Sequence, residues 1–420
     1  MKFATKRERH KQGKALREKC PRAAHAEWKP RSKSKDIVKL LEESDVDRIP
    51  GLIAVKYQRM GVSPFTFFRG AAIIQARDLA NSPVSGMGFR HAAIVIWRTL
   101  VALPLPNECW FSTSMTSMKP FLGRERMSEF AEMKVLDTWY ATISIDDLKE
   151  RFQKDPDMST RLSKKQKQAR SRNSEAVVPK LTAVVDGRRC IKDDPPVLYH
   201  FHHYAHNFQK GHAKFLGDYK KSLPIDKQRL FDRYRFEDSA IKVVGVGSVG
   251  TRCYLGLFLA DEDDPLFLQV KEARRSVLEK PGGRSLYAHQ GFRVVEGIRV
   301  MQGTTDIFLG YGRTQNHDYY LRQFRDMKVS AEVEIFRPST LVSYADMCGW
   351  ALARAHAKAG DAAMIAGYLG SSDQIDDSLV QYSEAYADQA EDDYEAFRKA
   401  IGSGRLSTEP AKEAGLEFLL

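Results

Sequence analysis

The feature that most constrains the fold is a glycine-rich loop followed by a strand rather than by a helix. Residues 245–250 read Gly-Val-Gly-Ser-Val-Gly. A dinucleotide-binding fold needs a helix directly after such a loop, so that the helix N-terminus meets the pyrophosphate. Here Cys253-Tyr-Leu-Gly-Leu-Phe-Leu predicts a strand, Asp261-Glu-Asp-Asp-Pro a turn, and Leu266-Phe-Leu-Gln-Val a further strand. The pattern disfavours a dinucleotide oxidoreductase and places the loop inside a β-hairpin.

A glycine loop in a β-hairpin is the arrangement of protein kinases, whose loop backbone covers the nucleotide phosphates while a lysine on the next strand reaches them. Lys271 stands at that place, and Glu296 on a predicted helix over 285–302 is expected to hold it in an ion pair. The expected nucleotide is ATP with magnesium. The candidate nucleotide-binding residues are Gly245, Gly247, Ser248, Gly250, Lys271, Glu296 and Arg69, with His289 and Glu272 as weaker candidates. The alternative is a hairpin whose glycines serve only the turn, with Lys271 a surface charge.

The net charge of +12 is concentrated at the N-terminus of the 420-residue chain. Residues 1–35 hold thirteen Lys or Arg and three Glu, so this segment carries +10 and the remainder only +2. Such a segment attracts nucleic acid or another polyanion, although a solvated extension without a partner has the same composition. A second basic surface is predicted on the helix near residues 161–172.

Cysteine usage and hydropathy indicate a cytoplasmic protein without a membrane partner. The five cysteines (20, 109, 190, 253 and 348) are scattered and odd in number, which argues against a disulfide framework. The N-terminus lacks the apolar stretch of a signal peptide. The most apolar run, residues 92–105, is too short to span a bilayer and contains Arg98.

The alternation of strand and helix patterns predicts an α+β fold, with a small antiparallel sheet and a larger helical part. Beyond the hairpin, strands are expected at Asp306–Tyr311 and Asp318–Phe324, and a helix at 341–357. The expected organisation is a basic N-terminal extension (1–35), a mainly helical part (36–235), a β-rich nucleotide-binding lobe (236–330) and a C-terminal helical part (331–420).

Several strings together resemble one family, the bacterial proteins catalogued as domain of unknown function 2252. They are Ser63-Pro-Phe-Thr-Phe-Phe-Arg-Gly-Ala-Ala, Phe130-Ala-Glu-Met-x-Val-Leu-Asp-x-Trp-Tyr, Lys242-Val-Val-Gly-Val-Gly-Ser-Val-Gly-Thr-Arg-Cys-Tyr, Leu268-Gln-Val-Lys-Glu-Ala, Arg322-Gln-Phe-Arg-Asp-Met-Lys and Cys348-Gly-Trp-Ala-Leu-Ala-Arg-Ala-His-Ala, with a shorter match at His25-Ala-Glu-Trp. The resemblance implies a permuted, kinase-like two-lobe architecture. It implies an ATP-dependent phosphotransferase acting on an unknown small-molecule or protein substrate, with the catalytic motif before the glycine loop.

The expected catalytic motif is missing from its place. In the family it runs C-G-D-x-H-x-x-N-F-G and then F-D-x-N-D-F-D-E-T, and it should follow Pro83-Val-Ser-Gly. Residues Ala92 to Pro120 can be back-translated with codons chosen only among synonyms. When the resulting nucleotides are read from one position earlier, they encode this motif. The single-codon residues Met115 and Met118 leave little freedom in that match. Residues 88–122 are therefore interpreted as an out-of-frame translation of the catalytic segment.

The consequence for activity follows directly. The presumed catalytic Asp, the metal-binding Asn and the metal-binding Asp would be absent, so we expect an inactive or purely nucleotide-binding chain, with no catalytic and no metal-ligating residue of its own. The later string His356-Ala-Lys-Ala-Gly-Asp361 lacks the required Asn, and Asp361 is interpreted as a turn residue. The alternative function is a non-catalytic nucleic-acid or polyanion-binding protein that acts through residues 1–35 and the basic helix.

Overall fold

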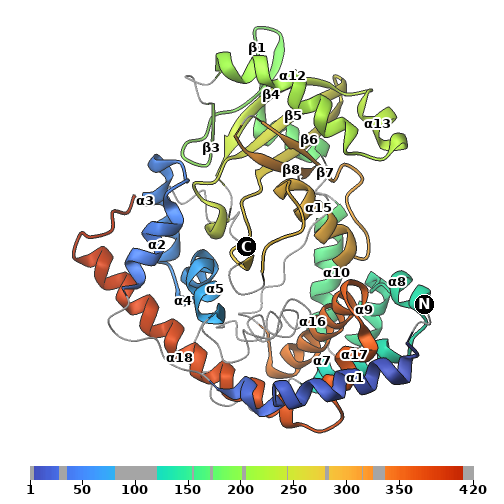
Figure 1. Ribbon diagram of the computed structural model, residues 1–420. Helices are drawn as coiled ribbons and strands as arrows, with labels where there is room; N and C mark the ends of the chain where they lie inside the picture. The colour runs from blue at the N-terminus through green and yellow to red at the C-terminus, as the bar shows by residue number, and fades with distance from the viewer. Residues whose placement is uncertain are drawn as a thin grey trace.

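A computed structural model shows an α+β protein, which confirms the predicted fold class, with a sheet at one end and helices around the remainder (Figure 1). The structure describes residues 4–27, 36–80, 121–153, 156–170, 174–200, 205–243, 245–279, 283–314, 316–324 and 336–409. The segment interpreted as out of frame, 88–122, lies outside these ranges except for its last two residues, which begin a helix. In the described part, no helix combines the length and apolar character needed to cross a bilayer.

The larger sheet is antiparallel throughout, in the order β3-β4-β5-β6-β8-β7. Its strands are β3 (Leu198–Tyr199), β4 (Arg235–Lys242), β5 (Cys253–Asp261), β6 (Asp264–Glu272), β7 (Gly310–Arg313) and β8 (Asp318–Gln323). Helix α15 (Gln290–Met301) lies in the chain between β6 and β7. The predicted strands of the hairpin are thus confirmed.

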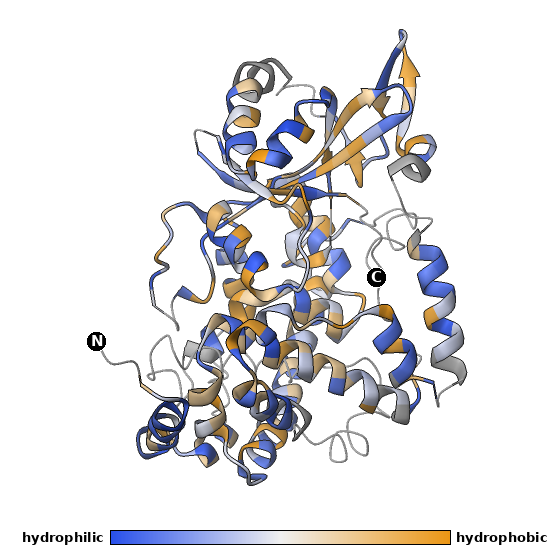
Figure 2. Cartoon of the chain, turned by 90° about the vertical axis from the view of Figure 1, so that its right-hand side faces the viewer, coloured by the Kyte–Doolittle hydropathy of each residue, from blue (hydrophilic) through white to orange (hydrophobic). Residues whose placement is uncertain are grey.

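The two faces of this sheet are covered differently, because successive side chains of a strand point to opposite sides. On one face, α12 (Ala205–Lys221) and α13 (Ile225–Phe231) contribute to an aromatic core with Phe258, Leu268 and Leu321. On the other face, α11 (Ser174–Leu181) and the hairpin of β1 (Thr182–Val185) and β2 (Arg188–Ile191) cover Leu255, Leu257 and Phe267. Apolar residues are accordingly dense in the strands (Figure 2).

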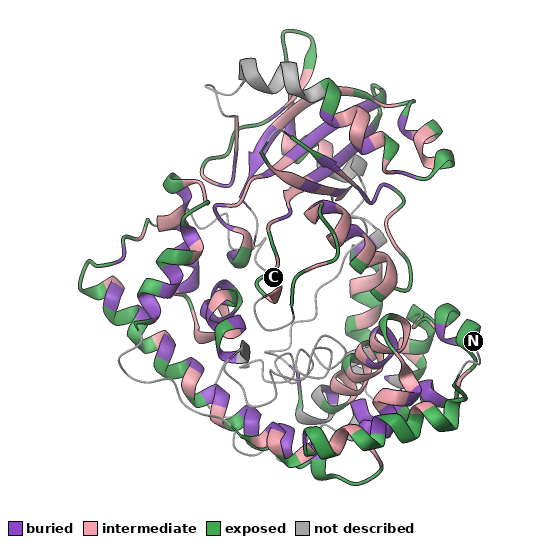
Figure 3. Ribbon diagram, in the orientation of Figure 1, coloured by how far each residue is buried: buried purple, intermediate pink, exposed green. Residues whose placement is uncertain are grey.

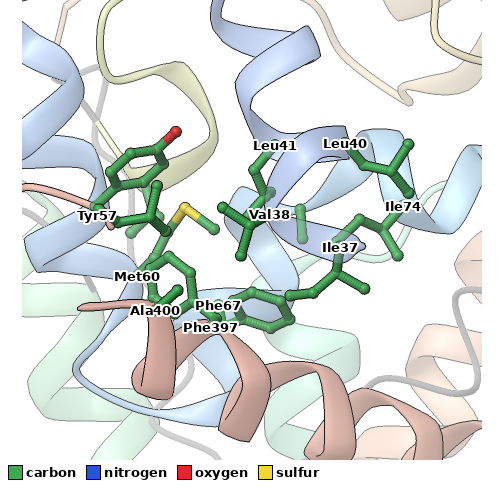
Figure 4. Close-up of a cluster of buried hydrophobic side chains, with 13 residues drawn as sticks. Ile37, Val38, Leu40, Leu41, Tyr57, Met60, Phe67, Ile74, Phe397 and Ala400 are labelled. Carbon is green, nitrogen blue, oxygen red and sulfur yellow. The ribbon is translucent and has the colours of Figure 1, made fainter. Parts of the chain in front are cut away.

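A second core joins the early helices to the long C-terminal helix α18 (Gln374–Gly402) (Figure 4). The early helices are α2 (Ile37–Asp45), α3 (Ile53–Met60), α4 (Pro64–Gly70) and α5 (Ala72–Ala80). Asp36 caps α2, and Ser63 with Thr66 forms a capping box on α4, so the sequence itself fixes both helix starts. Leu41, Met60 and Phe397 are fully buried at their junction.

The basic N-terminal segment contains a docked helix, α1 (Lys6–Lys19), which starts at a capping box formed by Thr5 and Glu8. Helix α1 packs against α17 (Ala362–Leu369). The contact is close at two glycines: a Cβ added to Gly13 would lie 1.9 Å from the Met364 carbonyl oxygen, and one added to Gly367 would lie 2.1 Å from that of His10.

Arginines of the same segment satisfy the carbonyl groups at the end of α17. Arg17 donates to the carbonyls of Gly367 and Tyr368 at 2.5 and 2.9 Å, and Arg22 donates to that of Leu369 at 2.7 Å. Cations near a helix C-terminus also interact favourably with its dipole. The described part of the segment is therefore attached to the body of the protein, while Arg7, Lys11 and Lys14 remain exposed.

The remaining helices are α7 (Phe121–Glu132), α8 (Val135–Tyr140), α9 (Ile145–Arg151), α10 (Pro156–Arg170) and α16 (Pro338–Ala359). Of these, α7 and α16 complete a third core around α17, where Phe130 and Leu369 meet. Buried residues are purple in Figure 3. Arg124 donates to the buried carboxylate of Asp376 at 2.8 Å, which ties α7 to α18.

Two differences from the sequence predictions have local causes. The strand expected at Asp306–Tyr311 begins only at Gly310, because a turn closed by Leu309 N–H and the Asp306 carbonyl precedes it. The β1–β2 hairpin was missed, although Asp186-Gly187 between two short apolar or extended runs is a known hairpin signal. Both turn residues have positive φ, of 49° and 74°.

The imidazole of His200 joins two acidic groups beside β4. Its Nδ1 lies 2.7 Å from Asp193 and its Nε2 lies 3.1 Å from Asp238. The hydrogen bond with Asp238 is the main cause that raises the pKa of His200 to about 9. Asp238 also accepts from the Ile191 backbone N–H at 2.7 Å, so the cluster ties β4 to β2.

This cluster predicts a pH dependence of stability. Since the folded-state pKa of His200 is raised above the ordinary value of 6.5 to about 9, its contribution should be complete below about pH 6.5 and lost as the pH rises through about 9. Urea unfolding at pH 6.5 and 9.5 should show a larger loss for the native chain than for His200→Gln. An equal loss in both proteins would contradict the assignment.

Candidate nucleotide site

The four predicted loop residues form one tight turn between β4 and β5. Gly247 and Ser248 belong to a short 3-10 helix, η4 (Val246–Ser248), which Gly245 precedes and Gly250 follows. Ser248 N–H donates to the Gly245 carbonyl at 2.8 Å, and the Thr251 hydroxyl donates to the Ser248 carbonyl at 2.7 Å. The loop is thus a compact structure held by its own backbone.

The loop is also fixed from outside, by residues between α2 and α3. Arg48 donates to the carbonyls of Val249 and Gly247, and the Ile49 N–H donates to the Gly250 carbonyl at 2.7 Å. Gly250 has φ of 82°, and a Cβ there would lie 3.1 Å from the Arg48 Cβ. Both the backbone conformation and the close approach therefore require glycine at this position.

A buried charge cluster lies behind Arg48. Asp45 accepts from the ammonium of Lys56 at 2.5 Å and from the hydroxyl of Tyr57 at 2.8 Å, and the Arg48 Nε lies 2.9 Å from the same carboxylate. The side chains of Lys56 and Asp45 are 0% and 4% exposed. Burial, followed by the nearby Arg48, lowers the pKa of Lys56 to about 8. Asp45 is therefore the counterion that keeps two cations in place under the loop.

Arg69, the candidate most distant in sequence from the loop, lies next to it. A Cβ on Gly247 would lie 2.9 Å from the Arg69 carbonyl oxygen, so the end of α4 contacts the loop directly. The Arg69 side chain is exposed, with its guanidinium 5.6 Å from the ring centre of Phe65. The structure thus brings the Arg69 backbone to the glycine loop, while the guanidinium lies beside Phe65.

Lys271 lies on β6 near the loop, in the first residue pair that β5 forms with β6 after the loop. It pairs with Cys253 of β5, three residues after Gly250, and with Tyr320 of β8. Burial raises the pKa of the Cys253 thiol to about 11, while the positive charges of Lys271, Lys242 and Arg322 act in the opposite direction. The side chains of Lys271, Lys242 and Arg322 therefore all lie near the Cys253 thiol on this face of the sheet.

Lys242 and Arg322 were not predicted as site residues. The signal that could have found them is the period of two, because residues two apart on a strand share a face. Lys242 ends the strand before the loop, and Arg322 follows Tyr320 by two positions. Their alignment with Lys271 depends on the strand register, which the sequence alone does not specify.

The remaining candidates have other contacts in the structure. Glu296 on α15 accepts from Arg299 at 3.1 Å, one helical turn further on, and a pair with Lys271 is not among the ion pairs of the described residues. Glu272 accepts from the Arg252 backbone and side chain at 2.9 and 3.2 Å. His289 caps α15 by accepting from the Phe292 N–H at 3.3 Å.

Among the described residues, no group of three or more His, Cys, Asp or Glu side chains is arranged to hold a metal ion. Asp361 caps α17 by accepting from the Met364 N–H at 3.0 Å, and it pairs with Arg9 at 2.9 Å. Its place at the start of this helix agrees with the interpretation of Asp361 as a turn residue.

The fold and the site together define an α+β protein in which an antiparallel sheet presents a glycine loop and a lysine beside a helical body. Residues 48–91 and 123–400 match the sequence model of a family described as an uncharacterized protein conserved in bacteria, domain of unknown function 2252. The chain belongs to this family, as the sequence motifs indicated. The match is interrupted at residues 92–122. The chain matches no curated protein and no solved structure.

Proposed function

We propose that the chain binds a nucleoside triphosphate with magnesium, such as ATP, in a kinase-like manner, within a family of phosphotransferases acting on a small-molecule or protein substrate. The observation that carries the proposal is the pairing of Lys271 with Cys253 at the loop end of the sheet. The glycine loop joins the first two strands of this unit, β4 and β5, and the lysine lies on the third, β6. Helix α15 with Glu296 follows. Protein kinases have their phosphate-binding parts in this order.

The fixed loop conformation supports a role in phosphate binding. Because a peptide unit is planar and trans, its N–H points away from its carbonyl oxygen. The Val249 carbonyl is directed to Arg48, so the Gly250 N–H of the same peptide unit is directed away from that guanidinium. Backbone N–H groups held in this way, with Lys271 nearby, suit an anionic phosphate.

The interrupted family match supports the reading-frame interpretation. Residues 92–122, where the match is absent, fall within the segment 88–122 that we interpret as an out-of-frame translation of the catalytic motif. We therefore propose that this chain binds nucleotide without transferring phosphate. The nucleotide sequence across codons 85–125 decides whether the in-frame motif exists in the gene.

The function is tested by the thermal stability of the whole chain with and without magnesium and ATP. We expect ATP at one hundred times its dissociation constant to stabilise the native chain by about 2.7 kcal/mol. Lys271→Ala should remove most of this gain by deleting the phosphate-neutralising charge. The matched control is Lys399→Ala, because the Lys399 side chain on α18 is 82% exposed. Absence of stabilisation in the native chain, or an equal loss in the control, would contradict the proposal.

A further inference from the structure

Helix α1 carries two sets of cations, and one set is already bound within the protein. The Lys6 ammonium donates to the Glu132 carbonyl at 2.9 Å, and Arg9 pairs with Asp361 at 2.9 Å. Arg17 donates to carbonyls at the end of α17. The charges of these three side chains are therefore engaged by the body of the protein.

The second set forms a stripe on the side of α1 that faces solvent. Arg7, Lys11 and Lys14 are four and three positions apart, the spacing that places side chains on one side of a helix. All three are exposed, and among the described residues their side chains make no ion pair. Gly13, at the contact with α17, marks the opposite side. Glu18 is exposed one turn beyond Lys14 and ends the stripe.

The spacing of this stripe suits a row of phosphates. At a rise of 1.5 Å per residue, the positions from Arg7 to Lys14 cover about 10 Å of helix. One strand of duplex DNA has a phosphate about every 3.4 Å along the axis, so about three phosphates fall within that length. Arg7 and Lys11 are like charges at neighbouring positions and repel one another on the free helix. A polyanion would relieve this repulsion.

Two properties of α1 favour nucleic acid over a membrane surface. A helix that lies in a membrane surface needs an apolar face for the lipid. The one large apolar residue of α1, Leu16, packs instead against the core around α17. The helix is also fixed, by its capping box and by the close approach at Gly13. Its cations are therefore presented without a further cost of ordering the backbone.

From this division of charge we infer that the solvent-facing side of α1 binds the phosphate backbone of double-stranded DNA through Arg7, Lys11 and Lys14. Contacts with phosphates carry no sequence information, so the binding is independent of sequence. The inference does not depend on the proposed nucleotide site, because the sheet with its glycine loop lies at the opposite end of the molecule from α1 (Figure 1).

The test is the salt dependence of binding between the whole chain and a fluorescently labelled DNA duplex, measured by anisotropy. The triple variant Arg7→Gln, Lys11→Gln and Lys14→Gln should reduce the slope of log K against log salt concentration by about 2.7, since each phosphate contact contributes about 0.9. Between about 50 and 200 mM salt, the native chain should therefore lose about 40-fold more of its affinity than the variant. Two duplexes of unrelated sequence should bind equally.

The matched control removes the same net charge elsewhere. Lys214→Gln, Lys221→Gln and Lys399→Gln change side chains that are 79%, 81% and 82% exposed on α12 and α18. This variant should keep the slope of the native chain. An equal change of slope in both triple variants would show that only the total charge matters, and it would overturn the assignment to α1.

Further measurements separate this inference from a folding defect and from the nucleotide site. The α1 variant should keep the thermal stability of the native chain, because glutamine is a good helix former and the three side chains have no ion pair to lose among the described residues. It should also keep the stabilisation by magnesium and ATP, while Lys271→Ala should keep DNA binding. Failure of the native chain to bind duplex DNA at about 50 mM salt would overturn the inference, and so would binding only to vesicles of anionic lipid.

Discussion

Replacing Asp45 with alanine is expected to lower the free energy of unfolding by about 3–5 kcal/mol, the cost of removing one partner from a buried ion pair. The substitution leaves the ammonium of Lys56, which is 0% exposed, without its counterion at 2.5 Å. It also removes the carboxylate beside Arg48 and the acceptor of the Tyr57 hydroxyl. Urea unfolding at neutral pH measures the loss.

The matched control for this prediction is Asp146→Ala. Asp146 pairs with Lys149 at 3.1 Å, but its side chain is 89% exposed, so the change should cost at most about 1 kcal/mol. The double variant Asp45→Leu with Lys56→Met removes both charges and should recover much of the stability lost in Asp45→Ala. A small loss in Asp45→Ala, similar to that of the control, would show that the buried cluster does not stabilise the fold.

The second large effect is expected at the contact between α1 and α17. In Gly13→Ala the new methyl group would lie 1.9 Å from a backbone oxygen of Met364, and backbone cannot move aside as a flexible side chain can. The helices must separate, so we expect a loss of about 1–3 kcal/mol in unfolding free energy, as for other overpacked contacts. Limited trypsin digestion should also cleave the exposed lysines of α1 faster.

Gly217→Ala provides the control for this second prediction. Gly217 lies inside helix α12, and nothing is within 4 Å of a Cβ added there. Alanine is favoured over glycine inside a helix, so this variant should gain about 0.5–1 kcal/mol. If Gly13→Ala were as stable as the native chain, with an unchanged digestion rate, the close contact of α1 with α17 would be contradicted.

The sheet and its loop could be predicted from the sequence because their signals are local. The short apolar runs of β5 and β6, and the turn residues between them, require only neighbouring positions. The position of Lys271 after the loop follows from the same pattern. The expected ion pair between Lys271 and Glu296 depended on how α15 approaches the sheet. In the structure the Glu296 carboxylate contacts Arg299 of the same helix instead.

The contacts that hold the site depend on long-range packing and were not predictable in this way. Arg48 lies between α2 and α3, and it donates to the carbonyl of Val249, 201 residues later in the chain. The charge of residues 1–35 suggested an extension, although Thr5 and Glu8 form a capping box that predicts a helix start. The net charge of this segment does not show that Arg17 and Arg22 donate hydrogen bonds to the carbonyls at the end of α17.

The contact between Arg48 and the glycine loop also bears on how the protein can be dissected. A recombinant fragment that begins at residue 236 would contain the whole loop and Lys271 but would lack both Arg48 and Ile49, whose groups bond the carbonyls of Gly247, Val249 and Gly250. In such a fragment, water molecules would have to replace the Arg48 and Ile49 donors at the loop carbonyls. The sheet and the helices before it are therefore a single unit for expression and crystallisation, despite their separation along the chain.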